Sequence, residues 1–304
     1  MLKNSTQDVG TRTVDHLTTG RLAGERHTDL NSAEAIPIFH DAENDEKKPA
    51  HGLGLLHNIA AAVNKSLAPI GIKITKSDAH DWNDVANFIP FESTMRAARA
   101  AGMCVGDYVD SVMNGVPGSS QDTIDKMASL GVFAPPMGVI VEVGPGTGRY
   151  LEKTLKIAKP SRYEIYETAD PWSAYLVKEY DVIFQPTDGY SMSATADASV
   201  DLVQAHKVLC AVPFMVNCHY WHEMARVVRP GGWAVFDLFT ERCLAGDAVE
   251  TWYKSGIHNG TYPAPVPRDV AVQFFERKDF SLVSSFILPM RPGVTELLVF
   301  RKAK

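Results

Sequence analysis

The sequence is poor in the features that mark secreted scaffolds and membrane proteins. It has four cysteines, Cys104, Cys210, Cys218 and Cys243, and no C-x-x-C pair. This argues against a disulfide scaffold or a cysteine zinc site and favours a reducing compartment. No apolar stretch approaches the roughly 18 residues of a spanning helix, and the first residues lack the apolar core of a signal peptide. We therefore expect a soluble, cytoplasmic protein with no membrane partner.

An excess of basic charge is also missing. Lysine and arginine number 30 against 36 acidic residues, which gives a net charge of -6 over 304 residues. A protein whose main task is to grip nucleic acid usually carries a basic surface, so no nucleic-acid partner is expected. The hydrophobic content of 45% is ordinary for a globular protein.

The chain divides into three parts by composition. Residues 1–50 carry many charges and a single aromatic, Phe39, which predicts a charged arm, either mobile or wrapped on the rest. Residues 51–136 are predicted to be a mostly helical cap module, followed by a main domain over 137–304. In the cap module, helices are expected at 52–63, 92–102 and 122–131, with a loop at 112–121.

From Met137 onwards, strand patterns alternate with helix patterns. This alternation predicts an α/β fold with a mostly parallel sheet covered by helices on both faces. The last two strand patterns are joined by a short connection, which predicts a terminal hairpin and one antiparallel strand. The expected strands are 138–143, 163–167, 181–186, 200–205, 233–239, 280–288 and 295–302, with helices at 150–158, 172–180 and 214–228.

A glycine-rich turn follows the first strand of this domain. Its sequence, Gly144, Pro145, Gly146, Thr147 and Gly148, permits a tight turn into a helix whose free N–H groups face a ligand. The G-x-G-x-G spacing departs from the G-x-G-x-x-G spacing of dinucleotide sites. We assign all five residues to cofactor binding.

Acidic residues stand near three successive strand ends. Glu142 precedes the turn, where its charge would repel a pyrophosphate but suit the ammonium and sulfonium groups of S-adenosylmethionine. Glu167, with Thr168 after it, is placed to accept both ribose hydroxyls. Asp188, followed by Gly189, is assigned to the exocyclic amine of adenine. Three acids in this arrangement predict S-adenosylmethionine as the cofactor.

These residues resemble the class I S-adenosylmethionine-dependent methyltransferases. Residues 141–148 resemble the family's first motif and 163–167 its second. Residues 199–209 resemble its fourth strand, and 225–237 the segment that leads into the fifth. The resemblance covers residues 137–239 and the terminal hairpin. It implies a Rossmann-like sheet of seven strands, and the helical module resembles the caps that many relatives place over the active site.

The acceptor side has one candidate base and four candidate contacts. His206 follows the fourth strand, where an imidazole can deprotonate a hydroxyl; the alternative is a histidine that only hydrogen-bonds backbone. Tyr150, Trp252, His258 and Tyr262 are assigned to substrate binding, although the same aromatic residues suit loop packing.

The spacing of His219 and His222 is compatible with two metal ligands, but no third ligand accompanies them, so no metal is expected. The sequence therefore predicts a methyltransferase, with the hydroxyl of a small molecule, sugar or glycan as acceptor. Alternatives are N-methylation of a small molecule and a non-catalytic S-adenosylmethionine-binding partner protein. An NAD-dependent oxidoreductase is disfavoured by the glycine spacing and Glu142, and a homodimer is left open.

Overall fold

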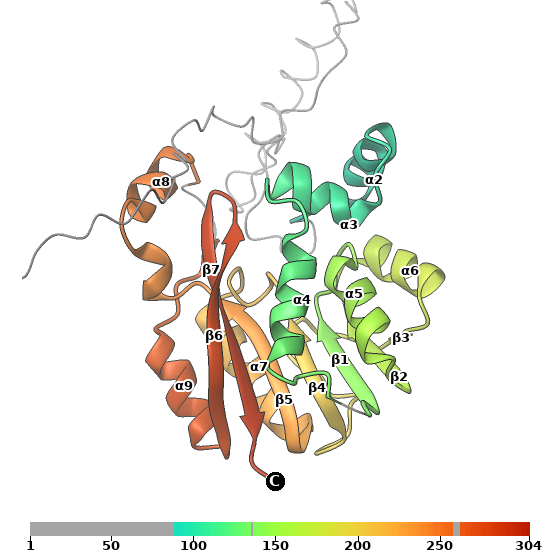
Figure 1. Ribbon diagram of the computed structural model, residues 1–304, viewed down its shortest axis with the longest axis vertical. Helices are drawn as coiled ribbons and strands as arrows, with labels where there is room; N and C mark the ends of the chain where they lie inside the picture. The colour runs from blue at the N-terminus through green and yellow to red at the C-terminus, as the bar shows by residue number, and fades with distance from the viewer. Residues whose placement is uncertain (1–87, 135, 258–261) are drawn as a thin grey trace, which may run out of the picture. The chain divides into compact units, whose positions relative to one another are not determined.

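The computed structural model describes residues 88–134, 136–257 and 262–304. The predicted arm over 1–50, the predicted helix over 52–63 and His258 lie outside the described residues. Within them, no helix is both long and apolar enough to cross a membrane. Figure 1 shows a set of short helices followed by a twisted sheet with helices on both faces.

The described residues form a seven-stranded sheet with the order β3-β2-β1-β4-β5-β7-β6. β1 to β5 pair in parallel, whereas β7 is antiparallel to both β5 and β6. The predicted α/β class and the antiparallel terminal hairpin are confirmed. The strands are β1 Val139–Val143, β2 Arg162–Tyr166, β3 Ile183–Phe184, β4 Val200–Ala205, β5 Val228–Leu238, β6 Phe280–Met290 and β7 Gly293–Lys302.

Helices cover the two faces of this sheet in separate groups (Figure 1). One hydrophobic core lies between the sheet and α4, α5 and α6, and another between the sheet and α7 and α9. The helices are α2 Phe91–Ala100, α3 Val105–Tyr108, η3 Val109–Met113, α4 Ser119–Ser129, α5 Arg149–Ala158, α6 Asp170–Glu179, α7 Phe214–Val227, η4 Glu241–Leu244, α8 Ala248–Lys254 and α9 Arg268–Glu276.

Two element boundaries differ from the sequence prediction for identifiable reasons. The fifth strand begins at Val228 rather than 233, because Val228 pairs with Val200 across a register shift. α4 begins at Ser119, inside the segment expected to be a loop. There, the backbone N–H and hydroxyl of Ser120 donate to the buried carboxylate of Asp110, at 3.0 and 2.5 Å. A side-chain acceptor of this kind stabilises a helix start that residue patterning does not reveal.

The segment after β5 is also more regular than predicted. The sequence of residues 251–265 predicts an irregular connection after the fifth strand, but α8 covers its first part and η4 precedes it. α9 was not predicted at all. Its buried side chains, Ala271 and Phe275, follow i, i+4 spacing.

The described helices of the N-terminal module pack on the helices that follow β1 and β2. The ring of Phe91 meets Trp172 edge to face at 4.8 Å, and the Trp172 indole donates to the Ile89 carbonyl at 2.7 Å. Arg149 and Asp110 form an ion pair of 2.8 Å with side chains 9% and 0% exposed. The module is therefore joined to α5 and α6 by both apolar and charged contacts.

Three phenylalanine rings tie α9 to the sheet. Phe275 stacks on Phe300 of β7 at 4.6 Å between ring centroids, and Phe236 of β5 lies 5.2 Å from Phe275. All three side chains have no exposed surface. Buried rings of this size contribute strongly to stability through apolar area and aromatic geometry.

We expect Phe275→Ala to lower the free energy of unfolding by about 3–5 kcal/mol, because a cavity replaces the ring. Val270→Ala on the same helix, where the side chain is 44% exposed, should change it by no more than about 0.5 kcal/mol. Denaturant titration of both variants measures the difference. Equal, small effects would show that α9 is not part of the cooperative core.

Candidate functional site

The turn between β1 and α5 contains three glycines with positive φ, Gly144 at 61°, Gly146 at 51° and Gly148 at 75°. A side chain at Gly144 would come within 2.6 Å of Val208, and one at Gly148 within 2.6 Å of Leu176. At Gly146, by contrast, nothing lies within 4 Å of the added Cβ position. The turn is therefore packed at both ends and open in the middle, where a ligand can approach the backbone.

The carboxylate of Glu167 joins this turn to the end of β2. It accepts from the Gly146 N–H at 2.8 Å and from the Ala169 N–H at 2.9 Å. The side chain is 6% exposed, and burial raises its pKa, opposed by these backbone donors. A side chain at Gly189 would touch Thr168 at 3.7 Å. The structure thus brings Gly146, Glu167, Thr168 and Gly189 into one neighbourhood.

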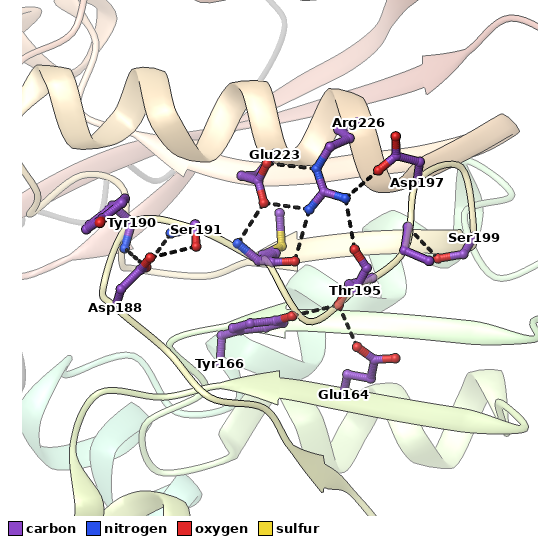
Figure 2. Close-up of polar contacts among 12 residues, drawn as sticks. Glu164, Tyr166, Asp188, Tyr190, Ser191, Thr195, Asp197, Ser199, Glu223 and Arg226 are labelled. Atoms are coloured by element: carbon purple, nitrogen blue, oxygen red, sulfur yellow. Dashed lines mark hydrogen bonds and ion pairs between the residues drawn. The ribbon is translucent and has the colours of Figure 1, made fainter.

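Asp188 lies on the segment between β3 and β4, and its carboxylate closes its own turn (Figure 2). It accepts from the N–H of Tyr190 at 3.0 Å and from the N–H and hydroxyl of Ser191, both at 2.7 Å. Burial alone would raise the pKa of Asp188, but these donors lower it. The carboxylate is consequently held charged and in one orientation.

The carboxylate of Glu142 is hydrogen-bonded to side chains of the two neighbouring strands, β2 and β4. It accepts from the Tyr163 hydroxyl at 2.5 Å and from the Gln204 amide at 3.0 Å, and the same amide reaches Thr154 at 3.1 Å. Glu142 is 1% exposed, and burial raises its pKa to about 7. The Glu142 carboxylate therefore accepts its hydrogen bonds from side chains of the protein itself, and its contact with the cofactor stays a prediction.

This pKa gives Glu142 a defined effect on stability. The ordinary value is 4.5, so the folded chain binds the proton more tightly than the unfolded chain does. The resulting stabilisation is present below about pH 4.5 and lost as pH rises through about 7, by about 3 kcal/mol in total.

Glu142→Gln, which cannot ionise, should therefore gain stability relative to the wild-type protein as pH rises from 4.5 to 7.5. Denaturant titrations across this range measure the difference, with the exposed Glu250→Gln as control. A difference between Glu142→Gln and wild type that is flat with pH would contradict the buried environment of the carboxyl group.

His206 follows β4 and stacks on Tyr150, with ring centroids 4.2 Å apart. Both rings are buried, and neither imidazole nitrogen has a hydrogen-bond partner. Burial lowers the pKa of His206 to about 3, so the imidazole is neutral at neutral pH. The backbone-bonding role considered from the sequence is not observed, which leaves one donor and one acceptor nitrogen for a ligand.

Lys207, the residue after His206, belongs to a buried polar cluster with Asp237 and Thr295. Lys207 has a φ of 61°, and its backbone N–H donates to Asp237 at 2.5 Å. The Lys207 ammonium lies 3.2 Å from Asp237 and 2.5 Å from the Thr295 hydroxyl. Sequence reasoning missed this cluster, although an acid at the end of a strand, as Asp237 is, was an available signal.

Two of the remaining acceptor candidates, Trp252 and Tyr262, belong to a separate aromatic group. Trp252 meets Tyr262 edge to face at 5.6 Å and Phe239 at 5.3 Å. The group adjoins the chain after His206, because the Ala264 N–H donates to the Cys210 carbonyl at 2.8 Å. The structure thus places Tyr150 against His206, and Trp252 with Tyr262.

The two histidines weighed as metal ligands take part in aromatic contacts. His222 meets Phe274 edge to face at 4.8 Å, and His219 lies 5.4 Å from Tyr190. Among the described residues, no group of three or more His, Cys, Asp or Glu side chains is placed to hold a metal ion.

Comparison with known proteins identifies one family match. Residues 141–236 match the family described as the methyltransferase domain, a range that contains the glycine turn, Glu167, Asp188 and His206. No curated protein matches the sequence.

Several solved structures are similar to this chain. Magnesium protoporphyrin IX methyltransferase from Synechocystis PCC 6803, with bound SAH, is 13% identical, and the match covers 74% of this chain and 100% of that chain with a TM-score of 0.49. The N-methyltransferase NodS from Bradyrhizobium japonicum WM9, in complex with S-adenosyl-L-homocysteine, is 15% identical over 61% of this chain and 88% of that chain, with a TM-score of 0.46.

Proposed function

We propose that this chain is a class I S-adenosylmethionine-dependent methyltransferase that methylates a hydroxyl oxygen of a small molecule, sugar or glycan, and the match to the methyltransferase domain over residues 141–236 supports the methyltransferase assignment. The observation that carries this proposal is His206, a buried neutral imidazole with two unpartnered nitrogens. Its loop reaches the glycine turn, since Val208 packs at the position where Gly144 would carry a side chain. A base beside the cofactor turn suits a hydroxyl, which must lose a proton on methylation.

The residues at the strand ends fit the cofactor. The open space at Gly146 admits a ligand to the backbone of the turn, and Glu167 retains acceptor capacity for ribose hydroxyls beyond its two backbone donors. Asp188, held charged, is placed to accept from the adenine amine. S-adenosylmethionine, when bound, supplies a methyl group activated by the sulfonium. Pro145, Thr147, Gly148, Thr168 and Gly189 complete the proposed cradle.

His206 acts as the proton acceptor in this proposal. A hydroxyl oxygen becomes strongly acidic as it forms its bond to the methyl carbon, so a base of low pKa suffices when it is placed within hydrogen-bond reach. One His206 nitrogen accepts that proton, while the stacked Tyr150 ring fixes the imidazole plane. The proton then leaves to solvent when product departs, because burial disfavours the charged imidazole.

In this proposal the acceptor contacts extend from His206 to the aromatic group. Trp252 and Tyr262 offer apolar ring surface next to the segment that follows His206. Such surfaces suit the apolar face of a sugar or a planar small molecule. We include His258 among these contacts only as a prediction from the sequence, because it lies outside the described residues.

The cofactor assignment predicts that the wild-type protein binds S-adenosylhomocysteine and that Glu167→Ala weakens this binding by roughly 10–100-fold, through loss of charged hydrogen bonds. Calorimetric titration measures both affinities. Glu179→Ala, at an exposed position of α6, should bind as the wild type does. Unchanged affinity in a folded Glu167→Ala protein would remove Glu167 from the cofactor site.

For His206, we expect His206→Asn to lower methyl transfer to a hydroxylated acceptor by roughly 100–10,000-fold, with S-adenosylhomocysteine affinity kept within about twofold. An assay of S-adenosylhomocysteine release against hydroxyl and amine acceptors identifies the substrate. The exposed His219→Asn is the matched control. Turnover confined to amines would refute O-methylation, and full activity of His206→Asn would refute the base.

A further inference from the structure

The segment between β3 and β4 carries Asp188 but has little regular structure of its own. Residues 185–199 contain only turns and bends. A ligand contact on such a segment depends on side chains from rigid elements to hold it in place. The structure shows which side chains do so (Figure 2).

Arg226 lies in the last turn of α7. All of its N–H donors bind either residues of the segment 185–199 or the carboxylate of Glu223. Its guanidinium donates twice to Glu223, at 2.8 and 2.6 Å. It also donates to the carbonyls of Met192 and Thr195, at 3.0 and 2.9 Å, and to the Asp197 carboxylate at 2.6 Å. A guanidinium has five N–H donors in a fixed planar fork, so none is left over.

Glu223 also accepts a hydrogen bond from the Met192 N–H at 2.9 Å. We call the pair of Arg226 and Glu223 the clamp. The pKa of Glu223 is lowered, chiefly by its hydrogen bond to Arg226. Both backbone polar groups of Met192 are thus held by α7, and the Met192 side chain is fully buried in the core. Met192 directly follows Ser191, whose N–H and hydroxyl close the Asp188 turn. The clamp therefore begins where that turn ends.

The other side of the segment is fixed to β2. The hydroxyls of Tyr166 and Thr195 lie 2.7 Å apart, and Thr195 donates to Glu164 at 2.6 Å. Tyr166 immediately precedes Glu167, the proposed ribose acceptor. The Asp188 segment is consequently joined both to α7 and to β2, the strand that ends directly before Glu167.

We propose that Arg226 is a positioning residue for cofactor recognition, which sets Asp188 at a fixed distance from Glu167 so that ribose and adenine are read together. This inference rests on the proposed function of these two acids. Lysine cannot replace Arg226, because an ammonium is a point charge with three donors and cannot span Glu223 and two backbone carbonyls. If Arg226 served only to stabilise the fold, its substitution would lower stability and leave the discrimination between ligands unchanged.

The test compares S-adenosylhomocysteine with S-inosylhomocysteine, which lacks the exocyclic amine. Calorimetric titration of the wild-type chain should give at least about tenfold tighter binding of the first ligand, since an unpaired acceptor is costly. Arg226→Lys should lower this ratio at least about fivefold. Asp188→Asn should also lower it, and the double variant should show no further loss, because both substitutions act on one contact.

Arg229→Lys is the matched control. Arg229 pairs with the Asp201 carboxylate through two guanidinium nitrogens, but at the amino end of β4, away from the proposed site. This variant should lose thermal stability and keep the binding ratio. Asp197→Ala, which removes one exposed contact of Arg226, provides a milder variant that folds if Arg226→Lys does not, with a smaller shift in the same direction.

The outcomes separate the two proposals. A wild-type protein that binds neither ligand would overturn the cofactor site and this inference together. Wild-type discrimination that survives in folded Arg226→Lys and Asp197→Ala would overturn the inference and leave the cofactor site standing. Equal wild-type affinity for the two ligands would show that Asp188 does not read the amine, and would also overturn the inference.

Discussion

The chain reverses its winding direction between β1 and β4, and the arrangement of the candidate site depends on that reversal. β2 and β3 are added on one side of β1, and β4 and β5 on the other. The carboxyl ends of β1 and β4 therefore meet where the strand order reverses, which is the place where ligands bind in open α/β sheets. Close packing of Val208 on Gly144 shows how near the loops after these two strands come, and it explains why the turn needs glycine there.

Burial sets the charge state of two groups near this point, His206 and Glu142. His206 and Glu142 are both buried without an opposite charge in contact. Burial lowers the pKa of His206 and raises the pKa of Glu142, and both shifts favour the neutral form of the group. Lys207 and Asp237, by contrast, are buried as a pair, so both charges are compensated. A site that holds few uncompensated charges is one from which water can be excluded, and this favours transfer of a methyl group from a cationic donor.

Residue patterning was sufficient to predict the seven strands and the helices α5, α6 and α7 of the main domain, because buried β-branched runs and the glycine spacing are local signals, but it missed η4, α8 and α9. It was insufficient for the partners of the acids. Glu142 meets Tyr163 and Gln204, which lie 21 and 62 positions away, and Asp188 accepts from its own turn. Such contacts depend on strand order and side-chain direction. The same limit applies to Asp110, which organises the start of α4 from the preceding π-helix, η3.

Two ion pairs lie next to the two parts of the proposed site, one on α7 and one between η3 and α5. Arg226 and Glu223 fix the segment that carries Asp188, on the cofactor side. Arg149 and Asp110 join the N-terminal helices to the first turn of α5, from which Tyr150 stacks on His206. Removal of one partner from a buried pair typically costs about 3–5 kcal/mol, so the Asp110 pair couples the helical module firmly to the acceptor side. We therefore expect changes in that module to reach the proposed acceptor contacts through Tyr150, and we expect cofactor affinity to respond to changes in α7.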